Sequence, residues 1–190
     1  TVKVPVFAPQ SPVRDELRGY VESHGYVAME AEHYTRRIDR DGAGWRAVEG
    51  LGRSGDSVIV QPTTVGTVAL DAIETSSPAL AYDMHLFSSG EFDLHLDCLP
   101  THPVSPGSGY RLAVSLNDGQ PFLPEEVRVS RRERMCSNLR RWRTTLTIDK
   151  PGPHTLKLWM VDPGVIVDRI TLYTRAPEES YLGPPESYRN

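Results

Sequence analysis

The central stretch of the chain reads Glu91-Phe92-Asp93-Leu94-His95-Leu96-Asp97-Cys98. Apolar and polar residues alternate in it, and a period of two is the pattern of a β-strand whose two faces differ. We therefore expect one face of this strand to lie in a core and the other to face water. Because Cys98 continues the apolar set, we expect a buried thiol there rather than half of a disulfide.

The same period recurs along the chain, within the ranges 80–86, 112–116, 142–148, 156–160 and 165–173. Turn-forming sequences such as Asn117-Asp118-Gly119 and Asp162-Pro163-Gly164 separate these runs. No stretch of helical period competes with them, apart from a turn or two within 131–141. The pattern predicts nine or ten short strands in an all-β fold, a two-sheet antiparallel β-sandwich of the jelly-roll type.

Length and composition indicate one globular domain with flanking segments. The chain has 190 residues, of which 38% are hydrophobic and 24% charged. Prolines gather near both ends, so we expect a linker or extension from an upstream domain over 1–23. The sandwich is expected over 24–175 and a C-terminal tail over 176–190. Because the chain begins at Thr1 without a signal peptide, we interpret it as a fragment or a processed product.

Several classes of function are disfavoured by the sequence. The net charge of −4 argues against a nucleic-acid partner. No apolar run approaches the roughly 20 residues that span a membrane. Neither a nucleophile elbow, nor a phosphate loop, nor a spaced Cys/His zinc motif is present. We therefore predict no catalytic residue and no enzyme activity for this chain alone.

Three carboxylates form a candidate metal site. In a strand over 26–34, Glu30 and Glu32 share one face and lie roughly 7 Å apart. Asp168 is expected in an apolar row with Ile166 and Ile170, where a carboxylate must be paired, coordinated or at the rim of the sandwich. If the first and last strands are neighbours, the three carboxylates converge and offer the oxygen ligands that Ca²⁺ prefers.

A simpler interpretation of these carboxylates stays open. Glu30 and Glu32 are also typical of a solvated strand face. A salt bridge to an arginine such as Arg53 or Arg169 would likewise satisfy the converging carboxylates without a cation.

Arginine is concentrated between positions 130 and 143, where six arginines stand against one acid, Glu133. Arginine binds carboxylates with two parallel hydrogen bonds, so an anionic sugar such as a uronic acid is a candidate ligand. Tryptophans offer stacking platforms for sugars but also fill sandwich cores. We predict a carbohydrate-binding surface of Arg140, Arg141, Trp142 and Trp159. The alternatives are a solvated loop or a contact with an acidic neighbouring domain for the arginines, and the core for the tryptophans.

Two long motifs stand out, HTLKLWMVDPGV over 154–165 and SYLGPPES over 180–187. GYVAMEAEHY over 25–34, Trp45 with LGRSG over 51–55, PTHP over 100–103 and AVSLNDG over 113–119 accompany them. These segments, which cover about 24–188, resemble in the same order the C-terminal domain of glycoside hydrolase family 115.

The resemblance implies a parent enzyme, a xylan α-1,2-glucuronidase, which removes glucuronic or 4-O-methylglucuronic acid from xylan. The family's catalytic acids are thought to lie in earlier domains, so this domain is expected to pack on the catalytic domain and to support glucuronoxylan recognition or homodimer formation. The alternative is an autonomous carbohydrate-binding module for glucuronoxylan, its oligosaccharides or uronic acids. A secreted or periplasmic parent follows from the polymeric substrate.

A second likeness is to carbohydrate-binding modules of families 6 and 35. These jelly rolls carry Glu-x-Glu in the first strand and Asp-x-Ile in the last, and both help to hold a structural calcium. Glu30, Glu32 and Asp168-Arg169-Ile170 match these positions, so the likeness implies a calcium ion there. Ile166 stands where these modules often have an asparagine that contacts the sugar, which sets the usual loop-end sugar site in doubt.

Overall fold

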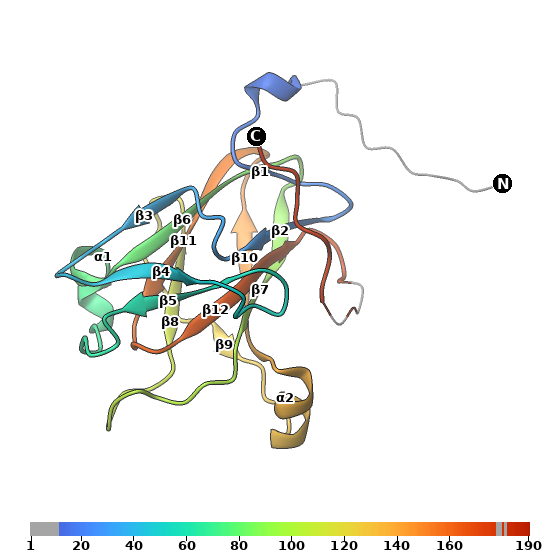
Figure 1. Cartoon of the computed structure of the whole chain (residues 1–190). Coiled ribbons are helices and arrows are strands. Elements are labelled where there is room, and N and C mark those ends of the chain that lie inside the picture. The colour runs from blue at the N-terminus through green and yellow to red at the C-terminus, as the bar shows by residue number, and fades with distance from the viewer. Residues whose placement is uncertain (1–11, 178–179, 181) are drawn as a thin grey trace.

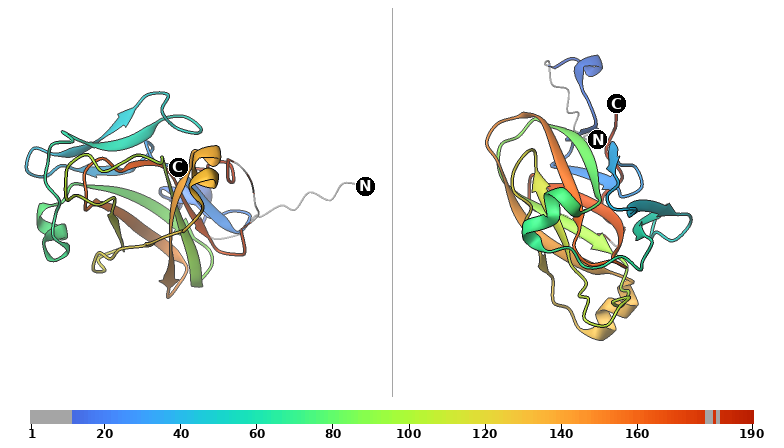
Figure 2. Two further views of the ribbon diagram at one scale, coloured as in Figure 1. Left: turned by 90° about the horizontal axis from the view of Figure 1, so that it is seen from below. Right: turned by 90° about the vertical axis from the view of Figure 1, so that its left-hand side faces the viewer.

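The computed structural model describes residues 12–177, 180 and 182–190. Its described residues form twelve β-strands, in two sheets, and only short helices. The helices are α1 (Ile73–Ser76), α2 (Arg131–Ser137) and two 3-10 turns, Arg14–Glu16 and Leu70–Ala72. α2 lies at the end of the molecule opposite the C-terminus (Figure 1 and the right-hand view of Figure 2).

The first sheet has five strands and orders them β1 (Tyr20–Val21), β6 (Ala79–Leu86), β11 (Gly152–Met160) and β8 (Leu112–Leu116), with β3 (Arg36–Ile38) also paired to β6. β1 runs parallel to β6, whereas the other pairs of this sheet are antiparallel.

The second sheet has seven strands, and all its pairs are antiparallel. Its order is β4 (Gly44–Val48), β5 (Ser57–Gln61), β12 (Ile166–Tyr173), β7 (Gly90–Cys98), β10 (Arg140–Ile148) and β9 (Glu125–Glu126). β2 (Tyr26–Glu30) also pairs with β12, so the first strand of the expected sandwich is a neighbour of the last.

The facing sides of the two sheets form the core, which confirms the predicted β-sandwich. Leu94 and Leu96 of β7 lie fully buried against residues such as Leu158 of the other sheet, as the alternation in 91–98 predicted. Cys98 is a buried free thiol, and Cys136 is free and exposed, which confirms that prediction too. The strand count exceeds the predicted nine or ten because β1, β3 and β9 have only two or three residues each.

β12 contains an irregularity that the period of two did not predict. Val167 pairs with Cys98 and Arg169 pairs with the adjacent Asp97, so β12 has one extra residue, Asp168, at a β-bulge. Val167 and Ile170 therefore both reach the core. The prediction that Asp168 shares an apolar row with Ile166 and Ile170 was wrong, because the bulge changes the face on which the following residues lie.

The described parts of both chain ends join the fold. Val21 N donates to Tyr188 O (2.9 Å), Ser187 N donates to Ala28 O (2.9 Å), and Asn190 N donates to Gly19 O (3.1 Å). The two ends consequently lie side by side at one pole of the molecule (Figure 1).

In the described ranges, no helix has the length and hydropathy that a membrane-spanning helix needs.

Candidate functional site

The three predicted metal ligands lie in one region, because β2 and β12 are hydrogen-bonded neighbours. Glu30 pairs with Arg169 across the two strands. Ala31 N donates to Asp168 O (3.1 Å), at the point where β2 ends and the chain turns toward Glu32.

Glu30 is engaged by an arginine. The Arg169 guanidinium forms an ion pair with the Glu30 carboxylate, and Ser54 Oγ donates to Glu30 Oε1 (3.1 Å). Only 11% of the Glu30 side chain and 7% of the Arg169 side chain are exposed. The salt-bridge alternative therefore describes Glu30, whose partner is Arg169. This ion pair leaves the other two carboxylates, Glu32 and Asp168, available to bind a cation.

Asp168 and Glu32 both contact the loop before β5. Asp168 Oδ1 accepts from Arg53 N (2.9 Å) and Ser57 Oγ (3.3 Å), and Glu32 Oε1 accepts from Asp56 N (3.0 Å). Burial raises the pKa of both carboxyl groups.

Oxygen atoms are crowded around this loop. A Cβ atom at Gly52 would lie 2.8 Å from Asp168 Oδ1 and from the carbonyl oxygens of Ser54 and Asp56. Glu32 Oε2 is buried without a hydrogen-bond partner among the described residues. A buried carboxylate oxygen with no donor, beside a cradle of carbonyls, fits a hard cation. No group of three or more Asp, Glu, His or Cys side chains in the described ranges has the arrangement of a metal site, so such a cation would rely on Glu32, Asp168 and backbone oxygens.

The outer face of the seven-stranded sheet carries a row of alternating charges, Glu30, Arg169, Asp97 and Arg141, on adjacent strands. Arg141 donates to both oxygens of Asp97 at 2.5 and 2.8 Å. Arg53 Nη1 also lies 3.6 Å from Asp97 Oδ2. We call Glu30, Arg169, Asp97 and Arg141 the charged row.

The remaining predicted sugar-binding arginine is also paired. Arg140 donates to both oxygens of Glu126 at 2.7 and 2.9 Å, and its guanidinium lies 4.2 Å from the centre of the Tyr110 ring. The forks of Arg140 and Arg141, which sequence reasoning assigned to a ligand carboxylate, thus hold carboxylates of the protein.

The two predicted sugar-binding tryptophans are buried in different places. Trp142 is 3% exposed and stacks on Tyr110, with ring centres 5.4 Å apart. Trp159 is 5% exposed, belongs to the other sheet and donates to Ser115 Oγ (3.0 Å). The structure therefore does not gather Arg140, Arg141, Trp142 and Trp159 at one surface, and sugar binding by them stays a prediction.

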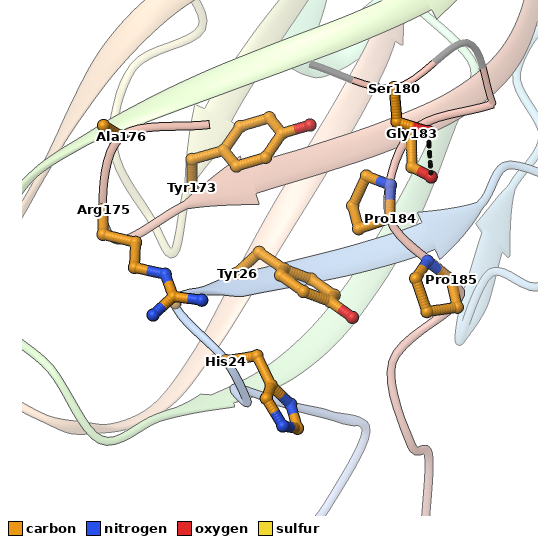
Figure 3. A pocket seen from close by; sticks show the side chains of 10 residues that line it. His24, Tyr26, Tyr173, Arg175, Ala176, Ser180, Gly183, Pro184 and Pro185 are labelled. Atoms are coloured by element: carbon orange, nitrogen blue, oxygen red, sulfur yellow. Dashed lines mark hydrogen bonds between the residues drawn. The ribbon is translucent and has the colours of Figure 1, made fainter. Parts of the chain in front are cut away.

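A pocket that the sequence did not reveal lies beyond the charged row, where β2 begins and β12 ends. It measures about 440 Å³ and is lined by His24, Gly25, Tyr26, Tyr173, Arg175, Ala176, Ser180, Gly183, Pro184 and Pro185. Figure 3 shows the Tyr26 and Tyr173 rings projecting from neighbouring strands, with Arg175 on one side and the tail prolines on the other. Tyrosines at the ends of two strands were the available signal, but their pairing depends on a register that the sequence does not display.

Comparison with known structures supports the same fold. BtGH115A, a family GH115 4-O-methyl-α-glucuronidase with specificity for decorated arabinogalactans, aligns with a TM-score of 0.58 and 20% identity over 92% of this chain and 20% of that one. A family 35 carbohydrate-binding module from Clostridium thermocellum aligns with a TM-score of 0.50 and 12% identity over 79% of this chain and 98% of that one. The chain thus spans about a fifth of the length of BtGH115A.

A comparison with curated proteins gave no match. The family model of the glycosyl hydrolase family 115 C-terminal domain matches residues 19–186. This match covers most of the chain, including the motif over 154–165, all but the last residue of the motif over 180–187, and the segments that line the pocket. The chain therefore belongs to the glycosyl hydrolase family 115 C-terminal domain family.

Proposed function

We propose that this chain is the non-catalytic C-terminal domain of a xylan α-1,2-glucuronidase, in which it packs on the catalytic domain and supports glucuronoxylan recognition or dimerisation. The family match over residues 19–186 carries the proposal. The 4-O-methyl-α-glucuronidase activity of BtGH115A supports the reaction type, although that enzyme is specific for decorated arabinogalactans.

The state of the described carboxylates supports a non-catalytic role. Glycoside hydrolysis needs two acids that face a substrate, one of them with a raised pKa. Glu30 and Asp97 on the outer sheet face, and Glu126 on the edge strand β9, each bind an arginine instead. The two carboxyl groups with raised pKa values, Glu32 and Asp168, point into a loop rather than into the pocket.

The test compares the longer protein that carries this chain, the same protein without residues 12–190, and the isolated 190-residue chain. Each is assayed for release of 4-O-methylglucuronic acid from glucuronoxylan. We expect release by the complete protein, no release by the isolated chain, and lower activity with a lower melting temperature for the truncated protein. Release by the isolated chain, or its absence from the complete protein, contradicts the proposal.

A structural calcium ion is a second element of the proposal. Glu32, Asp168 and the carbonyl oxygens of Ser54 and Asp56 would hold it, while Glu30 stays with Arg169. The ion would fix the loop before β5 against the end of β2, and its charge would offset the cost of burying two carboxylates.

Thermal unfolding of the chain in calcium and in chelator tests this ion. Calcium at 100 times its dissociation constant should stabilise the chain by about 2.7 kcal/mol. Glu32→Gln should abolish the response, whereas Glu91→Gln, at an exposed site on β7, should keep it. Equal melting temperatures of the wild type in calcium and in chelator contradict a calcium site.

Two further parts of the proposal concern location and assembly. A parent that acts on polymeric xylan would be secreted or periplasmic. It would associate as a homodimer if the domain supports dimerisation. Light scattering of the complete protein, with and without residues 12–190, measures this oligomeric state.

A further inference from the structure

The pocket rests on a matched pair of tyrosines. Tyr26 and Tyr173 are directly opposite in the antiparallel register of β2 and β12, so both side chains lie on the outer face of the sheet. Pro184 and Pro185 of the C-terminal segment form the facing wall (Figure 3). A cavity of about 440 Å³ lies within the range of pockets that hold small molecules.

The C-terminal segment, by which we mean 182–190, is fixed firmly enough to form that wall. Arg169 donates to the carbonyl oxygens of Leu182 and Pro184, the latter at 2.9 Å. Glu186 Oε1 accepts from Tyr20 Oη (3.1 Å) and Glu30 N (3.2 Å). The pocket is therefore built from two strands and a segment that hydrogen bonds hold in place.

Arg175 gives the pocket its charge. It is the one permanently charged side chain among the described lining residues, which include no carboxylate. Burial raises the pKa of Tyr26 and of Tyr173, so both phenols stay neutral at pH 7. The described lining therefore carries a net positive charge, which favours an anion.

Three polar groups of the lining are available to a ligand. In the described ranges, neither the Tyr26 hydroxyl, nor the Tyr173 hydroxyl, nor the Arg175 guanidinium forms a hydrogen bond with another residue. Two phenols and one guanidinium thus offer hydroxyl groups, aromatic faces and a bidentate fork within one cavity.

Gly25 provides the space for Arg175. It has a φ of +84°, and a Cβ atom there would lie 2.3 Å from the Arg175 side chain. Thr174 N donates to Gly25 O (2.9 Å), which fixes the chain just before Arg175. The local backbone therefore positions the arginine across the start of β2, at one side of the pocket.

We propose that this pocket binds a pyranose that carries a carboxylate, with the carboxylate on Arg175 and the sugar ring against Tyr26 and Tyr173. A sugar ring supplies apolar C–H faces for the aromatic rings and hydroxyl groups for the phenols, and a uronate supplies the anion. This inference deepens the proposed role in glucuronoxylan recognition and rests on it for the choice of sugar.

Calorimetric titration of the 190-residue chain tests the pocket, with methyl α-glucuronoside as the probe and methyl α-glucoside as its neutral match. We expect the glucuronoside to bind at least about tenfold more tightly, which corresponds to about 1.4 kcal/mol. Arg175→Gln should remove that difference, and Tyr173→Phe, which removes only a hydroxyl group, should weaken both sugars. Arg143→Gln, an exposed arginine of the same sheet, should bind as the wild type does.

Three results overturn the inference: no binding of the glucuronoside, equal affinity for the two glycosides, or unchanged discrimination in Arg175→Gln. Circular dichroism of each variant shows whether it is folded, and Tyr173→Phe gives an independent answer if Arg175→Gln unfolds.

Oligosaccharides distinguish the sources of the uronate. A xylo-oligosaccharide and a galactose oligosaccharide, each with one glucuronate branch, present the same sugar on different carriers. Tighter binding of the first supports the pocket with xylan as its source, and tighter binding of the second supports it with arabinogalactan. The second result contradicts the xylan assignment of the proposed function but leaves the pocket standing, so the two can fail separately.

Discussion

Two rows of side chains on the outer face of the seven-stranded sheet differ in how their polar groups are used. In the charged row, which crosses four strands, Glu30 binds Arg169 and Asp97 binds Arg141. Four residues along the same strands, Tyr26 and Tyr173 form the floor of a pocket, with Arg175 beside them. Arginine thus serves the fold in one row and is available to a ligand in the other.

The difference teaches that an arginine-rich sequence is not in itself a binding surface. A guanidinium that is partly buried needs a carboxylate to offset its desolvation, and a neighbouring strand can supply that carboxylate. The arginines of β10 have such neighbours, Asp93, Asp97 and Glu126. Arg175 lies after the end of β12, where no neighbouring strand is paired with it. Its guanidinium therefore forms no ion pair with a carboxylate in the described part of the chain.

The largest expected effect is in the charged row. Asp97→Ala leaves Arg141 and the buried Arg53 without this carboxylate, and we expect the free energy of unfolding to fall by about 3–5 kcal/mol. Urea denaturation measures it. The matched control is Asp93→Ala, which removes the partner of the exposed Arg143 and should cost less than about 1 kcal/mol. Equal losses in the free energy of unfolding for Asp97→Ala and Asp93→Ala would contradict the expected difference between buried and exposed ion pairs.

A smaller effect is expected where the C-terminal segment joins the two rows. Glu186→Ala removes the acceptor of Glu30 N and one of the two acceptors of Tyr20 Oη, the other being His33 O, and we expect a loss of about 1–2 kcal/mol. Because the segment walls the pocket, binding of methyl α-glucuronoside should also weaken. Tyr188→Ala, at an exposed site in the same segment, is the control. Undiminished sugar binding in Glu186→Ala would show that anchoring of the C-terminal segment does not affect the pocket.

The contact between His33 and Glu186 should make that junction sensitive to pH. The hydrogen bond to Glu186 raises the pKa of His33 above 6.5, so the folded state holds the proton more tightly than the unfolded state. The stabilisation is complete below pH 6.5 and is lost as the pH rises through the folded pKa. Since His33 is half exposed, we expect less than about 1 kcal/mol. The free energies of unfolding of the wild type and of His33→Gln, measured at pH 5.5 and at pH 8.5, test this. We expect the wild type to exceed the variant by more at pH 5.5, and a larger excess at pH 8.5 would contradict the prediction.

The smallest effect is expected at the pocket. Arg175→Gln should change the free energy of unfolding by no more than about 0.5 kcal/mol, because no described residue depends on its hydrogen bonds. Urea denaturation beside Arg141→Gln gives the comparison, since Arg141 holds Asp97. A loss at Arg175 as large as that at Arg141 would show that both arginines serve the fold.

The sequence predicted the architecture because burial of one strand face leaves a period of two. Leu94 and Leu96 alternate with Asp93 and His95, and they are buried as that period requires. The arginine pairs were not predictable, because which carboxylate meets Arg140 or Arg141 depends on register between strands far apart in the chain.

Two features of the candidate site exceeded what periodicity can provide. The extra residue at Asp168 changes the face of β12, and no glycine or proline marks the bulge in the sequence. Tyr26 and Tyr173 meet only because β2 is the neighbour of β12. Local patterns describe one strand at a time, whereas the carboxylate cluster and the pocket both arise from pairing between strands.

The closeness of the described chain ends has a consequence for engineering. Asn190 Nδ2 donates to Leu17 O (2.9 Å), so after forming both sheets the chain returns to the beginning of its described part. A domain with adjoining ends can be grafted into a surface loop of an unrelated carrier with short spacers. The same geometry permits circular permutation, with the ends joined and new ones opened in the exposed stretch 102–104, far from the pocket-forming strand ends.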